Sequence, residues 1–421
     1  MVKARTKESI QAYRIGALLM TIFVFLFAFT YIGVPGVGDI QYNAGRNIPV
    51  ATSTIPEIVI PGVAHLKTPG AVKGIYMTSC VASTPTLRAN LVKLLDETEL
   101  NSVVIDIKSF DGFISYKPTN KELEFATGGC FVKDMKDFIK TLHDRNIYVI
   151  GRLASFQDVL QVKLHPERAV KMASATSTVW RDHKGIPWIE ASSKAHWQYL
   201  ISIAKDAHSI GFDEINFDYI RFPSDGNTKD ILFPFSGTKR KNEVMRSFYQ
   251  FIHQELSPLG ITVSADVFGM TTTNSDDLNI GQILEDALPY FDYIAPMVYP
   301  SHYPVGFMNF SDPNKHVYEI VNYSMKTAVA RTVATTTRVV LPDARIGTST
   351  PALYVKPSFN KNKLRPWLQD NNYPVPYTAE MVKAQIRATY DTGLNSWMLW
   401  NAGNRYTRAA LELVPPEGTK N

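Results

Sequence analysis

From residue 72 onward, short apolar runs alternate with segments in which apolar residues recur every three or four positions. Short runs rich in Val, Ile, Phe and Tyr are typical of buried strands, whereas the longer spacing predicts amphipathic helices. Strands are expected at residues 74–78, 102–107, 147–153, 214–219, 262–268, 293–298, 364–368 and 396–400. Helices are expected at residues 86–98, 131–145, 193–210, 239–256, 282–288, 313–333 and 378–392.

This alternation of strands and helices predicts an α/β protein, specifically a (β/α)8 TIM barrel with insertions. A doubly wound open sheet is the alternative, but no glycine-rich phosphate loop follows the first strand. Residues 116–129, 157–190 and 338–363 are too irregular for core elements. We expect these three segments to form loops or small excursions over the barrel mouth, where loops shape substrate clefts.

An uncharged, mostly apolar run at residues 15–34 is about the length needed to cross a bilayer. Basic residues outnumber acidic ones before this run, so the positive-inside rule predicts that residues 1–14 are cytoplasmic. A cleaved signal peptide is the alternative, but its apolar core would be shorter, roughly 7 to 15 residues. We therefore expect a single-pass anchor in the cell membrane, with the C-terminal part of the chain extracytoplasmic.

After this run the composition changes twice. Gly, Pro, Ser, Thr and Ala are frequent in residues 35–70, which is typical of a flexible linker. The barrel domain is then expected at residues 71–413, followed by a tail at residues 414–421.

Charge and cysteine content narrow the function classes. The net charge is only +5 over 421 residues, so a nucleic-acid partner is not expected. The only cysteines are Cys80 and Cys130, in a domain expected to occupy an oxidising compartment. They form either a disulfide or two unpaired, packed thiols, and two cysteines alone do not make a metal site.

The segment GFDEINFDYIRFP, residues 211–223, places polar side chains on one face of an apolar strand. Because side chains alternate along a strand, Glu214, Asn216 and Asp218 point one way while Ile215 and Phe217 point the other. Unpaired carboxylates are costly to bury, so such a cluster is typical of a solvated cleft. The alternative is a structural ion pair with a buried base such as Arg221.

Other predicted strands also end in polar or aromatic residues, which is where TIM-barrel chemistry takes place. Asp106 and Lys108 are expected on one face of their strand. With Glu214 and Asn216, the candidates for substrate binding are Asp106, Lys108, Arg152, Arg221, Tyr299, His302, Trp367, Gln369, Trp400 and Asn401.

This set of residues suits glycoside hydrolysis, which needs one protonated and one ionised carboxyl group. Asp218 and Asp266, on the fourth and fifth strands, are the expected catalytic pair. Aromatic faces pack on sugar rings, while Arg, Asn and Gln bind hydroxyl groups. Neither a metal nor a cofactor is expected, because the histidines are scattered, no HExxH motif occurs, and Ser264 lacks the flanking glycines of a nucleophile elbow.

Several segments together resemble a known family. They are GIYMTSCVAS, DETELNSVVIDIKSFDGFISY, GFDEINFDYIRFPSDG, VSADVFGM, DYIAPMVYPSHYPVGF, LRPWLQD and GLNSWMLWNAGNRY. Over residues 72–408 the chain resembles the glycoside hydrolase barrel domain family, a bacterial domain-of-unknown-function group found on cell-envelope proteins. The resemblance implies a TIM barrel that degrades carbohydrate. Similarity to amylase-like and α-galactosidase-like barrels implies that Asp218 is the nucleophile, with Asp266 as acid/base or only a hydroxyl-binding residue.

We therefore expect a membrane-anchored, extracytoplasmic glycoside hydrolase with a polysaccharide substrate. The main alternative is a carbohydrate-binding barrel without catalysis. A third hypothesis is a phosphodiester or lipid-headgroup hydrolase in which acids such as Asp106, Glu214, Asp218 and Asp266 hold a divalent cation. Carboxyl groups about 5 to 10 Å apart across one pocket would favour hydrolysis, whereas a wider gap or salt bridges neutralising both acids would favour binding.

Overall fold

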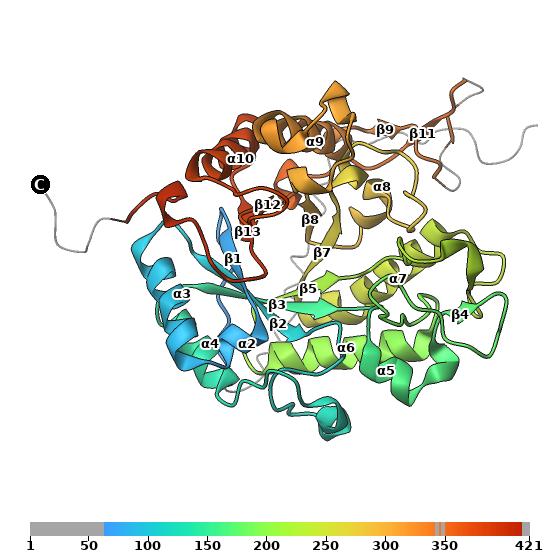
Figure 1. The fold of residues 1–421 in the computed structure, drawn as a ribbon, viewed down its shortest axis with the longest axis horizontal. Helices are drawn as coiled ribbons and strands as arrows, with labels where there is room; N and C mark the ends of the chain where they lie inside the picture. Colours follow the sequence, from blue (N-terminus) through green and yellow to red (C-terminus); the bar gives the residue numbers. More distant parts are fainter. Residues whose placement is uncertain (1–62, 342–344, 347–349, 415–421) are drawn as a thin grey trace, which may run out of the picture. The chain divides into compact units, whose positions relative to one another are not determined.

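A computed structural model describes residues 63–341, 345–346 and 350–414. Within these ranges, eight parallel strands close into a barrel in the order β1-β13-β12-β8-β7-β5-β3-β2 (Figure 1). The strands are β1 (Lys73–Met77), β2 (Ser102–Lys108), β3 (Tyr148–Ala154), β5 (Glu214–Asp218), β7 (Thr262–Phe268), β8 (Tyr293–Met297), β12 (Trp367–Gln369) and β13 (Trp397–Trp400). The predicted (β/α)8 barrel is confirmed, and each strand lies within three residues of its predicted position.

Helices surround this barrel in the described part of the chain (Figure 1). They are α2 (Ser79–Ala82), α3 (Pro85–Glu97), α4 (Met135–His143), α5 (Val159–Leu164), α6 (Lys194–Ser209), α7 (Lys241–Leu256), α8 (Leu284–Ala287), α9 (Val317–Val333) and α10 (Ala379–Asp391). The predicted starts at 131 and 313 were too early. Before α9 the chain forms a separate 3-10 turn at Pro313–Lys315, where Asp312 accepts from the N–H of Asn314.

The barrel strands are covered on both faces, which explains their long apolar runs. In β5 every residue is buried. Ile215 and Phe217 point outward, and Phe217 packs against Phe248 of α7 and Phe291. Glu214 and Asp218 therefore point into the barrel, as the alternation predicts.

The three irregular segments contain small elements of their own. Residues 116–129 include a 3-10 helix, Lys121–Ala126, and residues 157–190 include α5 and β4 (Lys171–Met172). β4 pairs with β6 (Ile231–Leu232), beyond β5. Residues 338–363 include β10 (Arg345–Ile346) and β11 (Leu353–Val355), and β11 also pairs with β9 (Thr336–Thr337). These insertions thus extend the connections between barrel elements.

Cys80 and Cys130 form a disulfide with a Cα–Cα distance of 4.7 Å. Cys80 belongs to α2, directly after β1, and Cys130 belongs to the long connection after β2. The bond therefore joins two connections that follow neighbouring strands.

No helix within the described ranges is long and apolar enough to span a membrane. The anchor expected at residues 15–34, the cytoplasmic segment 1–14 and most of the linker 35–70 lie outside those ranges.

Candidate active site

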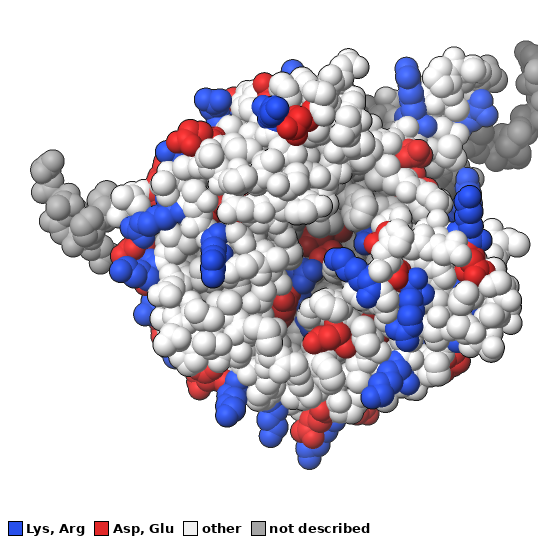
Figure 2. All heavy atoms as spheres, viewed as in Figure 1, with Lys and Arg blue, Asp and Glu red and all other residues white. Residues whose placement is uncertain are grey.

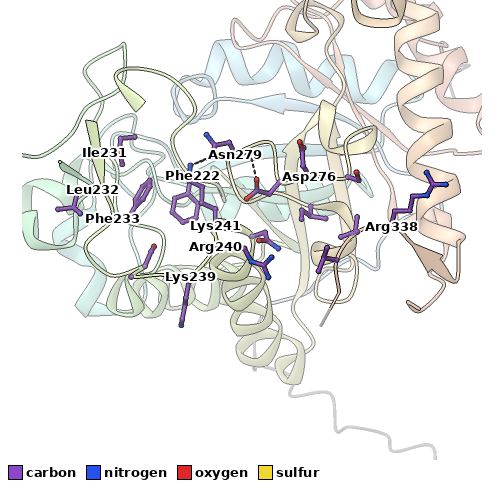
Figure 3. Close-up of a pocket in the computed structure, with 18 residues that line it drawn as sticks. Phe222, Ile231, Leu232, Phe233, Lys239, Arg240, Lys241, Asp276, Asn279 and Arg338 are labelled. Atoms are coloured by element: carbon purple, nitrogen blue, oxygen red, sulfur yellow. Dashed lines mark hydrogen bonds between the residues drawn. The ribbon is translucent and has the colours of Figure 1, made fainter. Parts of the chain in front are cut away.

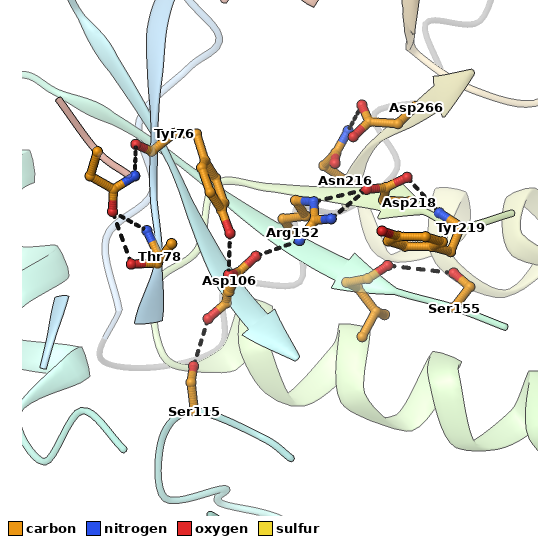
Figure 4. A network of polar contacts seen from close by, with 12 residues as sticks. Tyr76, Thr78, Asp106, Ser115, Arg152, Ser155, Asn216, Asp218, Tyr219 and Asp266 are labelled. Atoms are coloured by element: carbon orange, nitrogen blue, oxygen red, sulfur yellow. Dashed lines mark hydrogen bonds and ion pairs between the residues drawn. The ribbon is translucent and has the colours of Figure 1, made fainter. Parts of the chain in front are cut away.

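Asp218 ends β5 at the carboxyl end of the barrel, where Arg152 of β3 binds its carboxylate (Figure 4). The Nη2 and Nε groups of Arg152 donate to Oδ2 of Asp218 at 2.5 and 3.0 Å. The other oxygen, Oδ1, accepts from the backbone N–H of Tyr219 at 2.6 Å. Tyr219 has a φ of 52°, a backbone conformation that is uncommon for a bulky residue. Both oxygens of Asp218 are therefore fixed in direction.

Arg152 links Asp218 to a second carboxylate, that of Asp106 on β2. Its Nη1 donates to Oδ1 of Asp106 at 2.7 Å, and the hydroxyl of Tyr76 donates to Oδ2 at 2.5 Å. Burial opposes the charge of Arg152, but Asp218 and Asp106 together raise its pKa well above the ordinary value. Burial also raises the pKa of Asp106, against the opposing effect of Arg152. The guanidinium thus bridges two acids from separate strands.

Asp266, on the neighbouring strand β7, is bound differently. Its Oδ1 accepts from the amide of Asn216 at 2.9 Å and from the indole N–H of Trp367 at 2.8 Å, and both donors are neutral. Burial, and then the negative charge of Asp218, raise the pKa of Asp266 to about 8. The environment of this carboxyl group therefore favours its protonated form.

Both aspartates line one cavity of about 480 Å³. The space-filling view shows a hollow with acidic and basic side chains in this part of the molecule (Figure 2). The residues that line the cavity are Arg152, Asp218, Tyr219, Arg221, Asp225, Asp266, Phe268, Gly269, Met270, Met297, Tyr299, His302, Tyr303 and Trp400. The cavity volume falls in the range of small-molecule binding pockets.

Aromatic rings form one wall of the cavity. Trp400 stacks on Tyr76 with ring centroids 4.2 Å apart, and Trp367 meets Trp400 edge-on at 5.6 Å. Tyr299 lies beside them, with its centroid 6.5 Å from that of Trp400. Since Trp367 is fully buried, Trp400 and Tyr299 are the rings of this group that line the cavity.

The structure brings together most of the candidate residues from the sequence. Those that line the cavity are Asp218, Asp266, Arg152, Arg221, Tyr299, His302 and Trp400. Asp106, Asn216 and Trp367 lie directly behind it, where they contact Arg152 or Asp266.

Glu214 does not belong to this group. It is fully buried, binds Nη1 of Arg365 through both oxygens at 3.0 and 3.1 Å, and accepts from the hydroxyl of Tyr148 at 3.1 Å. Glu214 lies at the start of β5, four residues from the strand end, so it occupies a deeper layer of the barrel interior. The alternation identified its inward direction but not its depth, and a buried ion pair accounts for its charge.

Lys108 also lies elsewhere, contrary to the expectation that it shares a face with Asp106. The register of β2 against β3 shifts between Asp106 and Lys108, so that Lys108 is opposite Leu153. This irregularity turns Lys108 away from the barrel interior. Its ammonium instead forms a buried ion pair with Asp158 at 2.8 Å.

Gln369 and Asn401 hold loops together rather than lining the cavity. Gln369 donates to the backbone carbonyls of Asn371 and Tyr373. Asn401 donates to the backbone carbonyls of Asp370 and Arg405. Each therefore stabilises the connection that follows its own strand.

Several residues in the cavity or directly behind it were not predicted from the sequence. Tyr76, which binds Asp106, occupies an inward position of β1, so the alternation rule would have identified it had it been applied to this strand. Tyr219, Asp225, Met270 and Tyr303 lie on the connections after strands, which carry no such period.

Within the described residues, no group of three or more His, Cys, Asp or Glu side chains is arranged to hold a metal ion. Asp106 and Asp218 lie on either side of Arg152, whose guanidinium binds both of them. A fixed positive charge thus already occupies the place that a cation would take between them.

The family model described as "Putative glycosyl hydrolase domain" matches residues 74–406, and the chain belongs to this family. The match spans the barrel from β1 to the segment after β13. Among proteins of curated function, no sequence matches this chain.

Two solved structures illustrate what the chain is similar to. A hypothetical protein from Ruminiclostridium thermocellum ATCC 27405 shares 37% identity, with 46% of this chain and 97% of that chain covered and a TM-score of 0.42. The glycoside hydrolase domain of PgaB (BpsB) from Bordetella bronchiseptica shares 12% identity, with 79% and 94% covered and a TM-score of 0.52. The second likeness supports the barrel fold.

Proposed function

We propose that this protein is a glycoside hydrolase that cleaves a polysaccharide, with Asp218 and Asp266 as its two catalytic carboxyl groups. The observation that carries the proposal is the unequal environment of these two groups in one cavity. Asp218 is paired with Arg152, whereas the donors to Asp266 are neutral and burial raises its pKa to about 8. One charged and one protonated carboxyl group is the combination that glycoside hydrolysis requires.

Asp266 is the general acid in this proposal. At neutral pH its proton is available for the glycosidic oxygen of the leaving group, and Asn216 and Trp367 fix the orientation of the carboxyl group through Oδ1. The charged Asp218, oriented by Arg152 and the Tyr219 N–H, acts on the anomeric carbon as nucleophile, or activates a water molecule as general base.

The cavity walls suit a sugar ring. Trp400 and Tyr299 offer aromatic faces, while Arg221 and His302 offer polar groups for hydroxyls. We further propose that the domain is held at the outer face of the cell membrane by the apolar run at residues 15–34, so that the substrate is an extracytoplasmic polysaccharide.

A carbohydrate-binding barrel without catalysis would not need the two carboxyl groups to differ. Salt bridges neutralising both acids would favour that alternative, yet of these two acids Asp218 has an arginine partner and Asp266 has none in the described structure. The cation-dependent alternative is disfavoured because Arg152 already binds Asp106 and Asp218.

The test is release of reducing ends from a panel of polysaccharides by the full chain, with Asp218→Asn and Asp266→Asn variants as controls. Hydrolysis of at least one polymer by the wild type, and strong loss in both variants, would support the proposal. Equal activity in wild type and Asp218→Asn would remove Asp218 from the mechanism. Activity that disappears on chelation and returns with a divalent cation would favour the phosphodiester alternative.

A further inference from the structure

Arg221 is the second arginine of the cavity, and its guanidinium is bound in a different way from that of Arg152. It packs between Trp188 and Phe268, at 4.8 Å from each ring centroid. Its Nη1 donates to the backbone carbonyl of Phe222 and to the hydroxyl of Ser224. Among the described residues, no carboxylate lies within ion-pair distance of Arg221. Aromatic rings thus hold a cation beside the proposed catalytic pair.

Burial lowers the pKa of Arg221, which means that the protein environment disfavours its charge. Tyr219 and then Asp218, Asp225 and Asp182 oppose this lowering, but none of these three carboxylates forms an ion pair with Arg221. An anionic group of a ligand that enters the cavity would supply the missing counter-charge, through the fork of donors that suits carboxylate, phosphate and sulfate oxygens.

A second hollow, of about 700 Å³, is lined in part by residues of the connections after β5 and β7, which also line the first cavity. Phe222 follows Arg221 directly, and Ser275 and Asp276 follow the cavity residue Met270 by a few positions. Lys239, Arg240, Lys241 and Arg338 line this hollow, with Arg338 across from Phe222 and Phe233 in Figure 3. Figure 2 shows basic side chains gathered on one side of the central hollow.

Basic groups outnumber acidic ones among the residues that line this second hollow, although Arg240 is paired with Glu243 at 2.7 Å. Its two acids, Asp276 and Asp277, accept backbone N–H groups of their own turn. Lys241 donates to the backbone and side-chain oxygens of Asn279, which are neutral. The ammonium of Lys241 also lies 5.6 Å from the ring centroids of Phe222 and Phe233. The hollow therefore combines apolar faces for sugar rings with positive charge for acidic substituents.

From these contacts we infer that the substrate is an anionic polysaccharide, with one acidic group bound by Arg221 in the cavity and further acidic units bound in the hollow lined by Lys239 and Lys241. The inference rests on the proposed glycoside hydrolase function and names its substrate class. In both places the group that is bound would be a negatively charged oxygen group, carried by successive sugar units of the polymer.

The experiment measures binding rather than turnover, so that it can be separated from catalysis. Binding to polygalacturonate and to hyaluronan is compared with binding to the same polymers after reduction of their carboxyl groups to alcohols, using the full chain with Asp218→Asn. We expect at least one acidic polymer to bind tenfold or more tightly than its reduced form. Higher salt should weaken that preference, because it screens charge–charge attraction.

Arg221→Met, added to Asp218→Asn, keeps an apolar side chain between Trp188 and Phe268 but removes the charge. We expect it to abolish the preference for the acidic polymer, whereas Arg221→Lys retains part of it.

Lys239→Met should reduce the preference for long polymers more than for short oligomers. Lys383→Met, at an exposed position of α10, is the matched control and should change nothing. A melting temperature for each variant separates loss of binding from loss of folding.

Equal binding of acidic and reduced polymers, or an acidic preference that survives Arg221→Met, would overturn the inference. Absence of binding to both acidic polymers would also count against it. The proposed hydrolase function fails by a different result, namely no release of reducing ends from any polysaccharide by the wild type. An acidic preference without hydrolysis would therefore keep the anion site and reject the enzyme.

Discussion

Two buried clusters in one barrel interior share a strand yet differ in what they can do. At the start of β5, Glu214 is fully buried and bound by Arg365 and Tyr148. At the end of the same strand, Asp218 is 7% exposed and lines the cavity with Asp266. Both clusters pair an acid with an arginine. Only the second borders open space and a further carboxyl group, so position along the strand separates a structural ion pair from a candidate active site.

The largest expected effect is on turnover, when the cluster at the end of β5, which contains Asp218, is changed. Asp218→Asn removes the charge that acts on the anomeric carbon but preserves the size of the side chain. We expect kcat to fall by about a hundredfold to ten-thousandfold, the range typical of a positioned acid, base or nucleophile. Asp144→Asn, at an exposed position after α4, is the matched control. The measurement is the hydrolysis rate of wild type and both variants on the polysaccharide that the panel identifies as substrate.

A change in the cluster at the start of β5, which contains Glu214, should mainly lower stability. Glu214→Gln leaves the buried guanidinium of Arg365 without its counter-charge, which typically costs about 3–5 kcal/mol of stability. The free energy of unfolding, measured by denaturant titration, should fall by more than it does in Asp218→Asn, where Arg152 retains Asp106. If Glu214→Gln were as stable as wild type but inactive, Glu214 would belong to the site after all.

These two variants also mark the limit of what the sequence could predict. The spacing of apolar residues predicted the barrel, because each strand and helix must bury at least one apolar face whatever its neighbours are. Alternation likewise predicted that Glu214, Asn216 and Asp218 point inward. Depth in the barrel was not predictable, since it depends on which residues of other strands share the layer, such as Arg365 for Glu214 and Arg152 for Asp218.

The remaining features of the site could not be predicted, because they do not follow a periodic pattern of residues in the sequence. The shift of register after Asp106 reversed the expected direction of Lys108, and no single-sequence pattern marks such a shift. Tyr219 and Asp225 lie on the connection after β5, which adopts its shape only with the barrel formed. The acid/base difference between Asp218 and Asp266 arises from tertiary contacts with Arg152, Asn216 and Trp367.

A third prediction concerns stability against pH. The folded protein holds the proton of Asp266 up to a pH of about 8, whereas an aspartate in the unfolded chain loses its proton near 3.9. Between these values the folded state binds more protons, so this group makes the free energy of unfolding decrease as pH rises. Asp266→Asn should flatten that decrease. Denaturant titrations from pH 4 to pH 9 measure the difference, and identical slopes would contradict the raised pKa.

The smallest expected effect is a shift in the pH–rate profile. If protonated Asp266 is the general acid, kcat should fall as the pH rises through about 8. Trp367→Phe removes an N–H donor that favours the ionised carboxylate, so the alkaline limb should move to higher pH by less than about one unit. Movement to lower pH would show that the indole does not stabilise the ionised form.

The most direct measurement is the titration of Asp266 itself, followed by the carbon-13 chemical shift of its carboxyl group. We expect a midpoint near pH 8 in the wild-type protein. The midpoint should be lower in Asp218→Asn, yet still above the ordinary value because burial remains. A midpoint near 4 in both proteins would show that the cavity does not hold a protonated Asp266 beside Asp218.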